Sequence, residues 1–233
     1  MEHELINADF SRRVVVATDQ LPWVASPQAG VERRLLDRVG GEVARATSLV
    51  RYAPGRAFPA HEHALGEEFL VLEGIFSDEY GHYPAGTYVR NPPGSRHAPR
   101  TGPGCTILVK LRQMAPVERQ RVVVDTTAPG WVRGEIRGQW RLPLHSADRE
   151  AEWVTMERLE SGAMLPETNS PGGTEIFVLA GTLQDEHGVY GPGNWVRNPA
   201  GTRSALASTT SALYWAKRGH LPPAGTANHH DPS

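Results

Sequence analysis

The chain has 233 residues, with 24 Lys and Arg against 26 Asp and Glu, for a net charge of −2. This balance gives no electrostatic reason to expect binding to nucleic acid or to an anionic membrane. No apolar run approaches membrane-spanning length, and the first ten residues lack the apolar core of a signal peptide. We therefore expect a cytoplasmic location by default. A lone cysteine, Cys105, excludes an intramolecular disulfide.

The 24 glycines and 19 prolines are scattered between short apolar runs, a pattern typical of an all-β protein with many turns. No helical periodicity of ten or more residues is convincing. In chain order, β-forming runs predict strands at 14–16, 33–37, 43–52, 67–73, 75–79, 86–91 and 106–111.

The chain is a tandem repeat. Gly-Glu-Glu-Phe-Leu-Val-Leu-Glu-Gly at 66–74 recurs as Gly-Thr-Glu-Ile-Phe-Val-Leu-Ala-Gly at 173–181, 107 residues downstream. Val14-Val15-Val16 recurs as Val122-Val123-Val124 at an offset of 108. The repeat predicts a leader over 1–12, an N-terminal domain over 13–115, a C-terminal domain over 118–220 and a disordered tail over 221–233.

Three histidines and a glutamate are the candidate metal ligands. His61 and His63 are one residue apart, so on a strand they point to the same face. Glu67 begins the next apolar run, and His97 follows the tight turn Pro92-Pro93-Gly94. Imidazole nitrogens with one carboxylate suit Fe, Zn, Ni, Mn or Cu.

The second repeat keeps the glycine and proline frame but loses all four ligands. His61, His63, Glu67 and His97 are replaced by Thr168, Ser170, Thr174 and Ser204. Small hydroxyl side chains form no strong transition-metal site, and the joint loss indicates that the four act together. We therefore expect one divalent metal per chain, in the first repeat, and a degenerate, metal-free second repeat. Whether the second repeat binds another ligand through these hydroxyls stays open.

The motif Gly55-x5-His61-x-His63-x3-Glu67-x6-Gly74, followed by Gly86-x5-Pro92-x-Gly94-x2-His97, resembles the paired motifs of the cupin superfamily. More narrowly, both repeats resemble the cupin domain of ChrR-type anti-sigma factors, which is related to small non-haem dioxygenases of the acetylacetone-cleaving kind. The resemblance implies two tandem double-stranded β-helix (jelly-roll) barrels, a bicupin, with metal in the first. The helical zinc domain that holds the sigma factor in that family has no counterpart in the first dozen residues, so a sigma-factor partner is not expected.

Three functions remain open. The first is a mononuclear non-haem metal (Fe-type) dioxygenase or oxidoreductase acting on a small, diketone-like or phenolic molecule. The second is a ChrR-like regulatory or stress-sensing metal-binding module without catalysis, because fold alone does not imply an activity. The third is a metal-dependent isomerase or metabolite-binding cupin. The expected partner is a small-molecule ligand, not nucleic acid or a membrane, and the sequence leaves a homodimer open.

No catalytic residue is assigned beyond the metal centre. Glu68 recurs in the metal-free repeat, as does Arg90, and strand alternation turns Glu68 away from Glu67, so a structural ion pair is predicted. The candidates for lining the pocket of the first barrel are Tyr52, Phe69, Val71, Phe76 and Tyr88.

Overall fold

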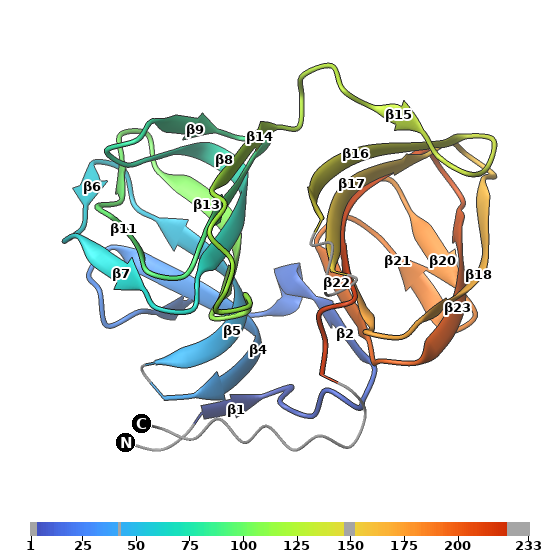
Figure 1. Cartoon of the computed structure of the whole chain (residues 1–233), viewed down its shortest axis with the longest axis horizontal. Helices are drawn as coiled ribbons and strands as arrows, with labels where there is room; N and C mark the ends of the chain where they lie inside the picture. The colour runs from blue at the N-terminus through green and yellow to red at the C-terminus, as the bar shows by residue number, and fades with distance from the viewer. Residues whose placement is uncertain (1–3, 42, 147–151, 223–233) are drawn as a thin grey trace. The chain divides into compact units, whose positions relative to one another are not determined.

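The computed structural model describes residues 4–222 except 42 and 147–151, and it is built from β-strands (Figure 1). In this part of the chain the helical structure is one 3-10 turn, Thr18–Gln20, and no helix is long and apolar enough to cross a membrane. The chain divides into two compact units. One contains Met1–Ala8 and Thr18–Pro129, and the other contains Asp9–Ala17 and Gly130–Ser233. Each unit is a barrel of antiparallel strands, which confirms the predicted fold class.

The first barrel is built around one long antiparallel path. Its strands, in spatial order, are β1 (Glu4–Ile6), β4 (Val31–Gly40), β5 (Ala44–Tyr52), β13 (Cys105–Leu111), β8 (Glu67–Ser77), β10 (Thr87–Asn91) and β14 (Val122–Asp125). Shorter strands complete it: β3 (Val24–Ala25), β6 (Arg56–Ala57), β7 (His61–His63), β9 (His82–Pro84), β11 (Ser95–His97) and β12 (Arg100–Thr101). The pair β7–β11 carries the candidate histidines.

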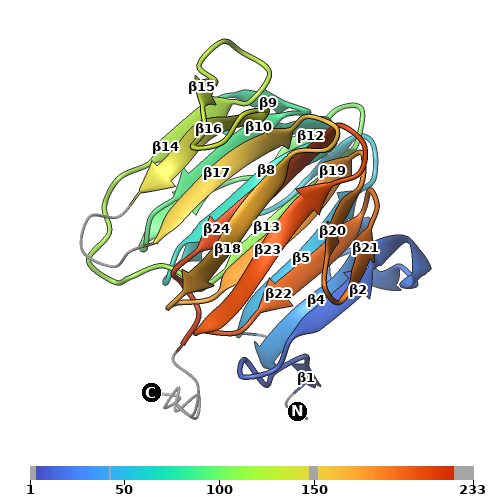
Figure 2. The same cartoon turned by 90° about the vertical axis from the view of Figure 1, so that its right-hand side faces the viewer.

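The second barrel repeats this plan with two sheets (Figure 2). The larger contains β15 (Val132–Arg133), β16 (Gln139–Ser146), β17 (Trp153–Leu159), β24 (Ala212–Arg218), β19 (Thr174–Ala180), β22 (Asn194–Asn198) and β2 (Val14–Ala17). The smaller contains β18 (Met164–Ser170), β23 (Thr202–Ser208), β20 (Leu183–Asp185) and β21 (Gly188–Tyr190).

The first strand of each repeat completes the barrel of the other repeat. Strand β2 pairs with β22, with Val14 opposite Arg197, and β14 pairs with β10, with Val122 opposite Arg90. The boundaries 13–115 and 118–220 therefore describe the repeats in sequence but assign these two strands to the wrong barrel. The reason is that an apolar run shows that a segment is a strand, whereas the sheet edge it pairs with is set by the tertiary fold.

The structure differs from the prediction at the N-terminal end of the chain, and it describes only the first two residues of the predicted tail. Residues 4–6 of the predicted leader form β1, which pairs with β4 through Leu5 opposite Val39. The leader thus contributes a strand to the first barrel. The predicted tail lies outside the described residues from 223 onward.

Strand alternation places the core of each barrel on the inner face of its sheet. Phe69 and Val71 of β8 pack there with Val89 and Val109, and Ile176 and Val178 of β19 take the same place in the second barrel. On the other face of β8, Glu68 and Arg90 form a buried ion pair at 2.7 Å, so the predicted structural pair is confirmed.

One glycine position that both repeats share, Gly74 and Gly181, is required by the backbone conformation. Gly74 and Gly181 both have φ of +71°, in the left-handed region that L side chains rarely adopt. A Cβ at either position would lie 1.9 Å from a carbonyl oxygen, that of Gly104 or of Ser211. Any side chain is therefore excluded at Gly74 within β8 and at Gly181 directly after β19.

Candidate metal centre

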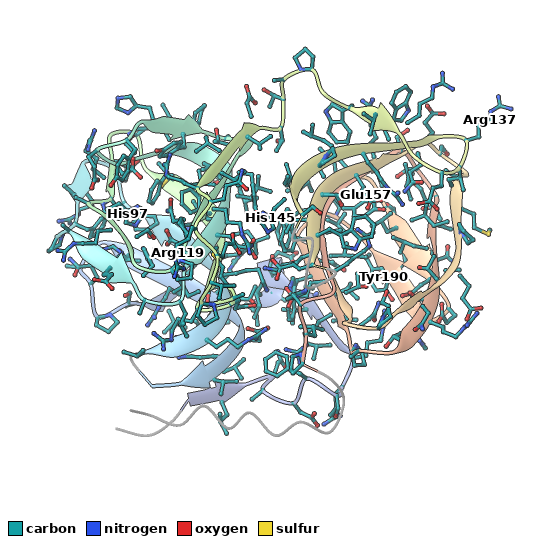
Figure 3. All side chains as sticks on the ribbon, in the orientation of Figure 1. His97, Arg119, Arg137, His145, Glu157 and Tyr190 are labelled. Carbon is teal, nitrogen blue, oxygen red and sulfur yellow. The ribbon has the colours of Figure 1, made fainter. Side chains whose placement is uncertain are left out.

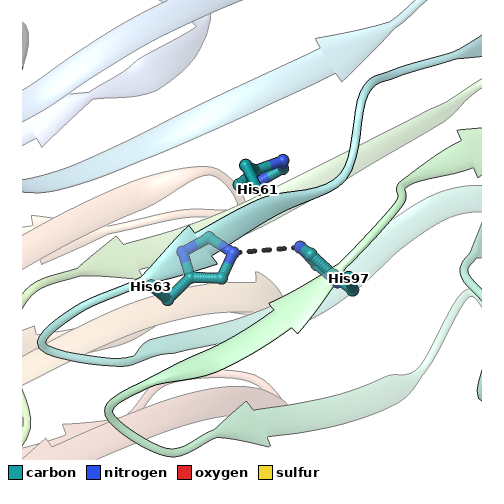
Figure 4. Close-up of side chains that lie close together, drawn as sticks. All are labelled: His61, His63 and His97. Atoms are coloured by element: carbon teal, nitrogen blue, oxygen red, sulfur yellow. Dashed lines mark hydrogen bonds between the residues drawn. The ribbon is translucent and has the colours of Figure 1, made fainter.

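The three histidines meet on the short strand pair β7–β11. His61 and His63 share one face of β7, and His97 of β11 stands opposite His61 in the register (Figure 4). One ring nitrogen from each of the three lies within 4.8 Å of the others, and the Nε2 atoms of His63 and His97 are 3.0 Å apart. The tight turn after β10 returns the chain so that His97 comes opposite His61 and lies diagonally across from His63.

Glu67 comes to the same place from the start of β8. Its Oε2 lies 3.4 Å from Nε2 of His63 and 3.5 Å from Nε2 of His97, and Nδ2 of Asn91 donates to it at 3.2 Å. The side chain is 7% exposed. Among the described residues, no lysine or arginine pairs with it. The four residues singled out in the sequence are thus neighbours.

Outer hydrogen bonds orient two of the imidazoles. Nδ1 of His61 lies 3.1 Å from the carbonyl oxygen of Pro59, and Nδ1 of His97 lies 3.4 Å from Oδ2 of Asp78. Both oxygens only accept, so Nδ1 carries the proton in each ring and the Nε2 lone pair is left for the cluster. Asp78 is itself fixed by the hydroxyl of Tyr83, which donates at 2.9 Å.

The electrostatics of the cluster differ from ring to ring. Burial lowers the pKa of His63 by more than the nearby Glu67 carboxylate raises it. For His97, burial alone would lower the pKa, but the hydrogen bond to Asp78 and the charge of Glu67 raise it above its ordinary value. The imidazole of His63 is therefore uncharged at pH 7, the form that binds a metal ion. At His97 a metal ion must displace a more tightly held proton.

These residues fit a divalent cation. Two imidazole nitrogens 3.0 Å apart need a proton between them, and a metal ion can take the place of that proton. A buried carboxylate without a cationic partner is costly, and a metal ion would balance the charge of Glu67. Three nitrogens and one oxygen form a donor set suited to first-row divalent ions.

A cavity of about 370 Å³ opens beside the cluster. His61, His63 and Glu67 line it, and so do apolar side chains of β5 and β13 together with Phe58 and Arg33. Neither Phe58 nor Arg33 was singled out in the sequence, although Arg33 belongs to a strand predicted at 33–37.

The five pocket candidates lie in three places. Tyr52 lines the cavity, and burial raises its pKa, so its phenol stays neutral. Phe69, Val71 and Phe76 are buried in the core cluster below it. Tyr88 lies on the opposite face of its strand, where its hydroxyl donates to Glu68 at 2.7 Å. Strand alternation separates Tyr88 from Val89, which is in the core.

The four hydroxyl residues of the second repeat also lie together. Thr168 of β18 stands opposite Ser204 of β23, and the hydroxyl of Thr174 donates to that of Ser170 at 2.9 Å. The four line one narrow cleft inside the second barrel.

Comparison with known proteins agrees with this architecture. The model of the ChrR cupin-like domain family matches residues 11–115 and again 119–222. A comparison with curated proteins gives no match.

Three solved structures illustrate the likeness in fold. A candidate dioxygenase from Nostoc punctiforme superposes with a TM-score of 0.74 and 14% identity, covering 96% of this chain and 88% of that one. The bacterial pirin YhhW from Escherichia coli, in complex with nickel(II), gives 0.65 and 11%, covering 91% and 100%. A cupin 2 conserved barrel domain protein from Leptotrichia buccalis gives 0.60 and 12%, covering 88% and 96%. At such identities the likeness shows the fold alone.

Proposed function

We propose that this chain, which belongs to the ChrR cupin-like domain family, is a metal-dependent oxidoreductase of the dioxygenase kind. It acts on a small organic molecule at the histidine cluster of the first barrel. The observation that carries this proposal is the position of the cluster: His61, His63 and Glu67 form part of the wall of a 370 Å³ cavity. A site that faces a cavity is typical of catalytic centres, whereas structural metal sites are closed.

In this proposal His61, His63, Glu67 and His97 hold the metal. An iron-type ion held by these residues would supply Lewis acidity and redox chemistry toward a small organic substrate and O₂. Binding and orientation of the substrate depend on other side chains of the cavity.

The other cavity residues bind and orient the substrate. Tyr52, Phe58 and Leu111 form apolar walls that hold the substrate body and exclude water. Arg33 supplies a cation to the same cavity, where it attracts an enolate or phenolate oxygen. The substrate class is therefore a small enolisable diketone or a phenol.

The metal assignment is tested by elemental analysis of protein purified without added metal. We expect about one first-row ion per chain in the wild type and little in His61→Ala/His63→Ala. The matched control, Thr168→Ala/Ser170→Ala, changes the equivalent positions of the second barrel and should retain the wild-type metal content. Equal metal content in the wild type and the histidine variant would show that the cluster is not the site.

The activity is tested by O₂ consumption of the iron-loaded protein with a panel of β-diketones and catechols. We expect consumption that depends on both substrate and metal. Full metal loading without O₂ consumption, and without binding of any panel member, would refute the enzyme. That result would favour the regulatory alternative, in which a partner protein dissociates on addition of oxidant or chelator.

A further inference from the structure

The second barrel has a cavity of its own, of about 500 Å³, at the position that corresponds to the metal cavity. Thr168 and Ser170, which replace His61 and His63, line it. Next to them, Leu165 and Pro166 stand where the first barrel has Phe58 and Pro59. The second repeat has therefore kept the cavity while losing the metal ligands.

The wall of this cavity has changed from apolar to charged. Glu157 of β17 is paired across the sheet with Tyr214, as Val50 of the first barrel is paired with Ile107. Arg218 stands at the position of Leu111 by the same register. Two inner positions gain a charge, Glu157 and Arg218 in place of Val50 and Leu111. At a third, Trp153 takes the place of Ala46.

Glu157 lies within the second barrel (Figure 3), where it is the centre of a buried polar network. It is 0% exposed, pairs with Nη1 of Arg218 at 2.7 Å, and accepts a hydrogen bond from the hydroxyl of Tyr214 at 2.8 Å. Burial alone would raise its pKa, but Arg218 and Tyr214 lower it below the ordinary value, so the group is ionised at neutral pH.

Burying this charge costs free energy that an apolar residue would not. The first barrel folds with a valine at the same place. The network is therefore not needed for the fold.

The cavity wall carries two guanidinium groups, those of Arg141 and Arg218, and the carboxylate of Glu135, whereas the carboxylate of Glu157 is fully buried. Both guanidinium groups face this buried carboxylate. Nε of Arg141 lies 3.8 Å from Oε1 of Glu157, too far for a hydrogen bond, and it is buried without a hydrogen-bond partner among the described residues. Arg141 also forms an ion pair with Glu135 at 2.9 Å. Glu135 lines the same cavity, but its side chain is 75% exposed and its charge is therefore screened by water.

An aromatic face adjoins the two cations. The guanidinium carbons of Arg218 and Arg141 lie 4.7 Å and 5.5 Å from the ring centroid of Trp153, which lines the same cavity. Leu165 and Ile136 add apolar surface to the lining. A cation next to an indole ring suits an anion with a flat apolar body, because the cation pairs with the charge and the ring stacks on the body.

We propose that the second barrel is a binding site for a small organic carboxylate with a flat apolar body. The carboxylate lies against Arg141 and Arg218, and the body lies against Trp153. Thr168 and Ser170 offer hydroxyls at the other wall. The volume falls within the range of about 300–1,000 Å³ that small-molecule sites occupy.

The test uses benzoate as the probe and calorimetry on the full chain. The His61→Ala/His63→Ala variant serves as the background, so that benzoate cannot bind to a metal in the first barrel. We expect one saturable site per chain, with benzamide, the neutral analogue, binding at least about tenfold more weakly, because an Arg–carboxylate pair is worth that much.

Two arginine variants assign the site to a barrel. Arg141→Met should weaken benzoate binding about tenfold or more, whereas Arg33→Met, the equivalent change in the first barrel, should leave it unchanged. A third variant, Glu157→Val/Arg218→Leu, removes the ion pair as a unit and copies the first barrel, so it should fold and lose benzoate binding. The proposal is overturned by absence of saturable binding up to about 10 mM, by equal affinity for benzamide, or by unchanged binding in folded Arg141→Met.

Discussion

Asp78 shows how one carboxylate can support both a turn and a metal centre. Its Oδ1 accepts the backbone N–H of Tyr80 at 2.8 Å, which closes the β8–β9 turn, and its Oδ2 holds Nδ1 of His97. Asp185 repeats the turn contact in the second barrel, with the N–H of His187 donating at 2.8 Å, but Ser204 stands where His97 would be. The same residue type therefore has an extra role in the first barrel alone.

Asp78→Asn should lower metal affinity about tenfold to a hundredfold, because a histidine ligand loses the carboxylate that fixes its tautomer and orientation. Asp185→Asn is the matched control and should leave metal affinity unchanged. Competitive metal titration against a chelator measures both. Equal affinity in the wild type and Asp78→Asn would mean that the turn contact is the whole role of Asp78.

Glu157 should make the second barrel sensitive to acid. Its pKa is lowered in the folded state, so its contribution to stability is fully present above its unfolded value of about 4.5 and is lost as the pH falls through the folded pKa. Glu157→Gln should destabilise the protein by about 3–5 kcal/mol at pH 7, because Arg218 loses its buried partner. Urea unfolding at several pH values should show the gap between variant and wild type shrinking below about pH 4.5. A gap independent of pH would mean that Glu157 is not ionised.

At the residue scale, spacing and the repeat were enough to find His61, His63, Glu67 and His97, because their joint replacement is visible in the sequence. The hydrogen bond from His97 to Asp78 could not be predicted in this way. An aspartate stands at this position in both repeats, which indicates a role in the scaffold. Glu157 and Arg218 are marked in the sequence by the repeat itself. They are charged residues at positions where the other repeat has Val50 and Leu111.

Among the elements, the exchanged strands β2 and β14 are the feature that differs most from expectation. Each occupies the edge of the sheet of the other repeat's barrel. The N–H of Thr126 donates to the carbonyl of Gly86 at 2.9 Å, so by strand alternation the N–H of Val124 also points toward β10. Proline at that position removes a ladder hydrogen bond.

Val124→Pro should therefore weaken the first barrel and lower the amount of metal it retains on dialysis, although residue 124 lies in the second repeat. Val16→Pro, the equivalent change in β2, should destabilise the second barrel and leave metal retention unchanged. Elemental analysis after dialysis, beside thermal unfolding, distinguishes the two. Metal loss in Val16→Pro but not in Val124→Pro would contradict the observed pairing.

The remaining elements follow from local sequence more closely. Runs of apolar and β-branched residues predicted most of the long strands, but the strands expected at 67–73 and 75–79 are one strand, β8. The register between β8 and β13 shifts just before Gly74, between the pairs Ile107–Val71 and Thr106–Glu73. A bulge of this kind bends a strand without ending it. The glycine was therefore a correct mark of distortion but not of a strand end.

On the scale of the whole molecule, one backbone plan carries two different sites. The first barrel gathers imidazoles at its cavity, and the second gathers guanidinium groups, a carboxylate and an indole at the equivalent cavity. The duplication was evident from the sequence, and so was the loss of metal ligands. The cavity that replaced them depends on side chains from three strands, β16, β17 and β24, which only the folded sheet brings together.

Metal should accordingly stabilise one barrel and not the other. At a free metal concentration 100 times the dissociation constant, ligand binding adds about 2.7 kcal/mol to the stability of the state that binds it. We expect scanning calorimetry to show one unfolding component moving to higher temperature on metal addition, with the shift absent in His61→Ala/His63→Ala. An equal shift of the whole transition in that variant would show that the metal acts elsewhere.

The exchanged strands also bear on the ancestry of the chain. A protein with a single copy of this repeat would have a first strand and an unpaired sheet edge. It would have no second repeat in the same polypeptide with which to exchange that strand. Two such polypeptides could close both edges by giving each other that strand, as a reciprocal dimer. The present chain has the connectivity of that dimer after gene fusion. In a fused chain of this kind each copy can diverge, and one set of ligands can be lost while that copy still supplies a strand to the other barrel.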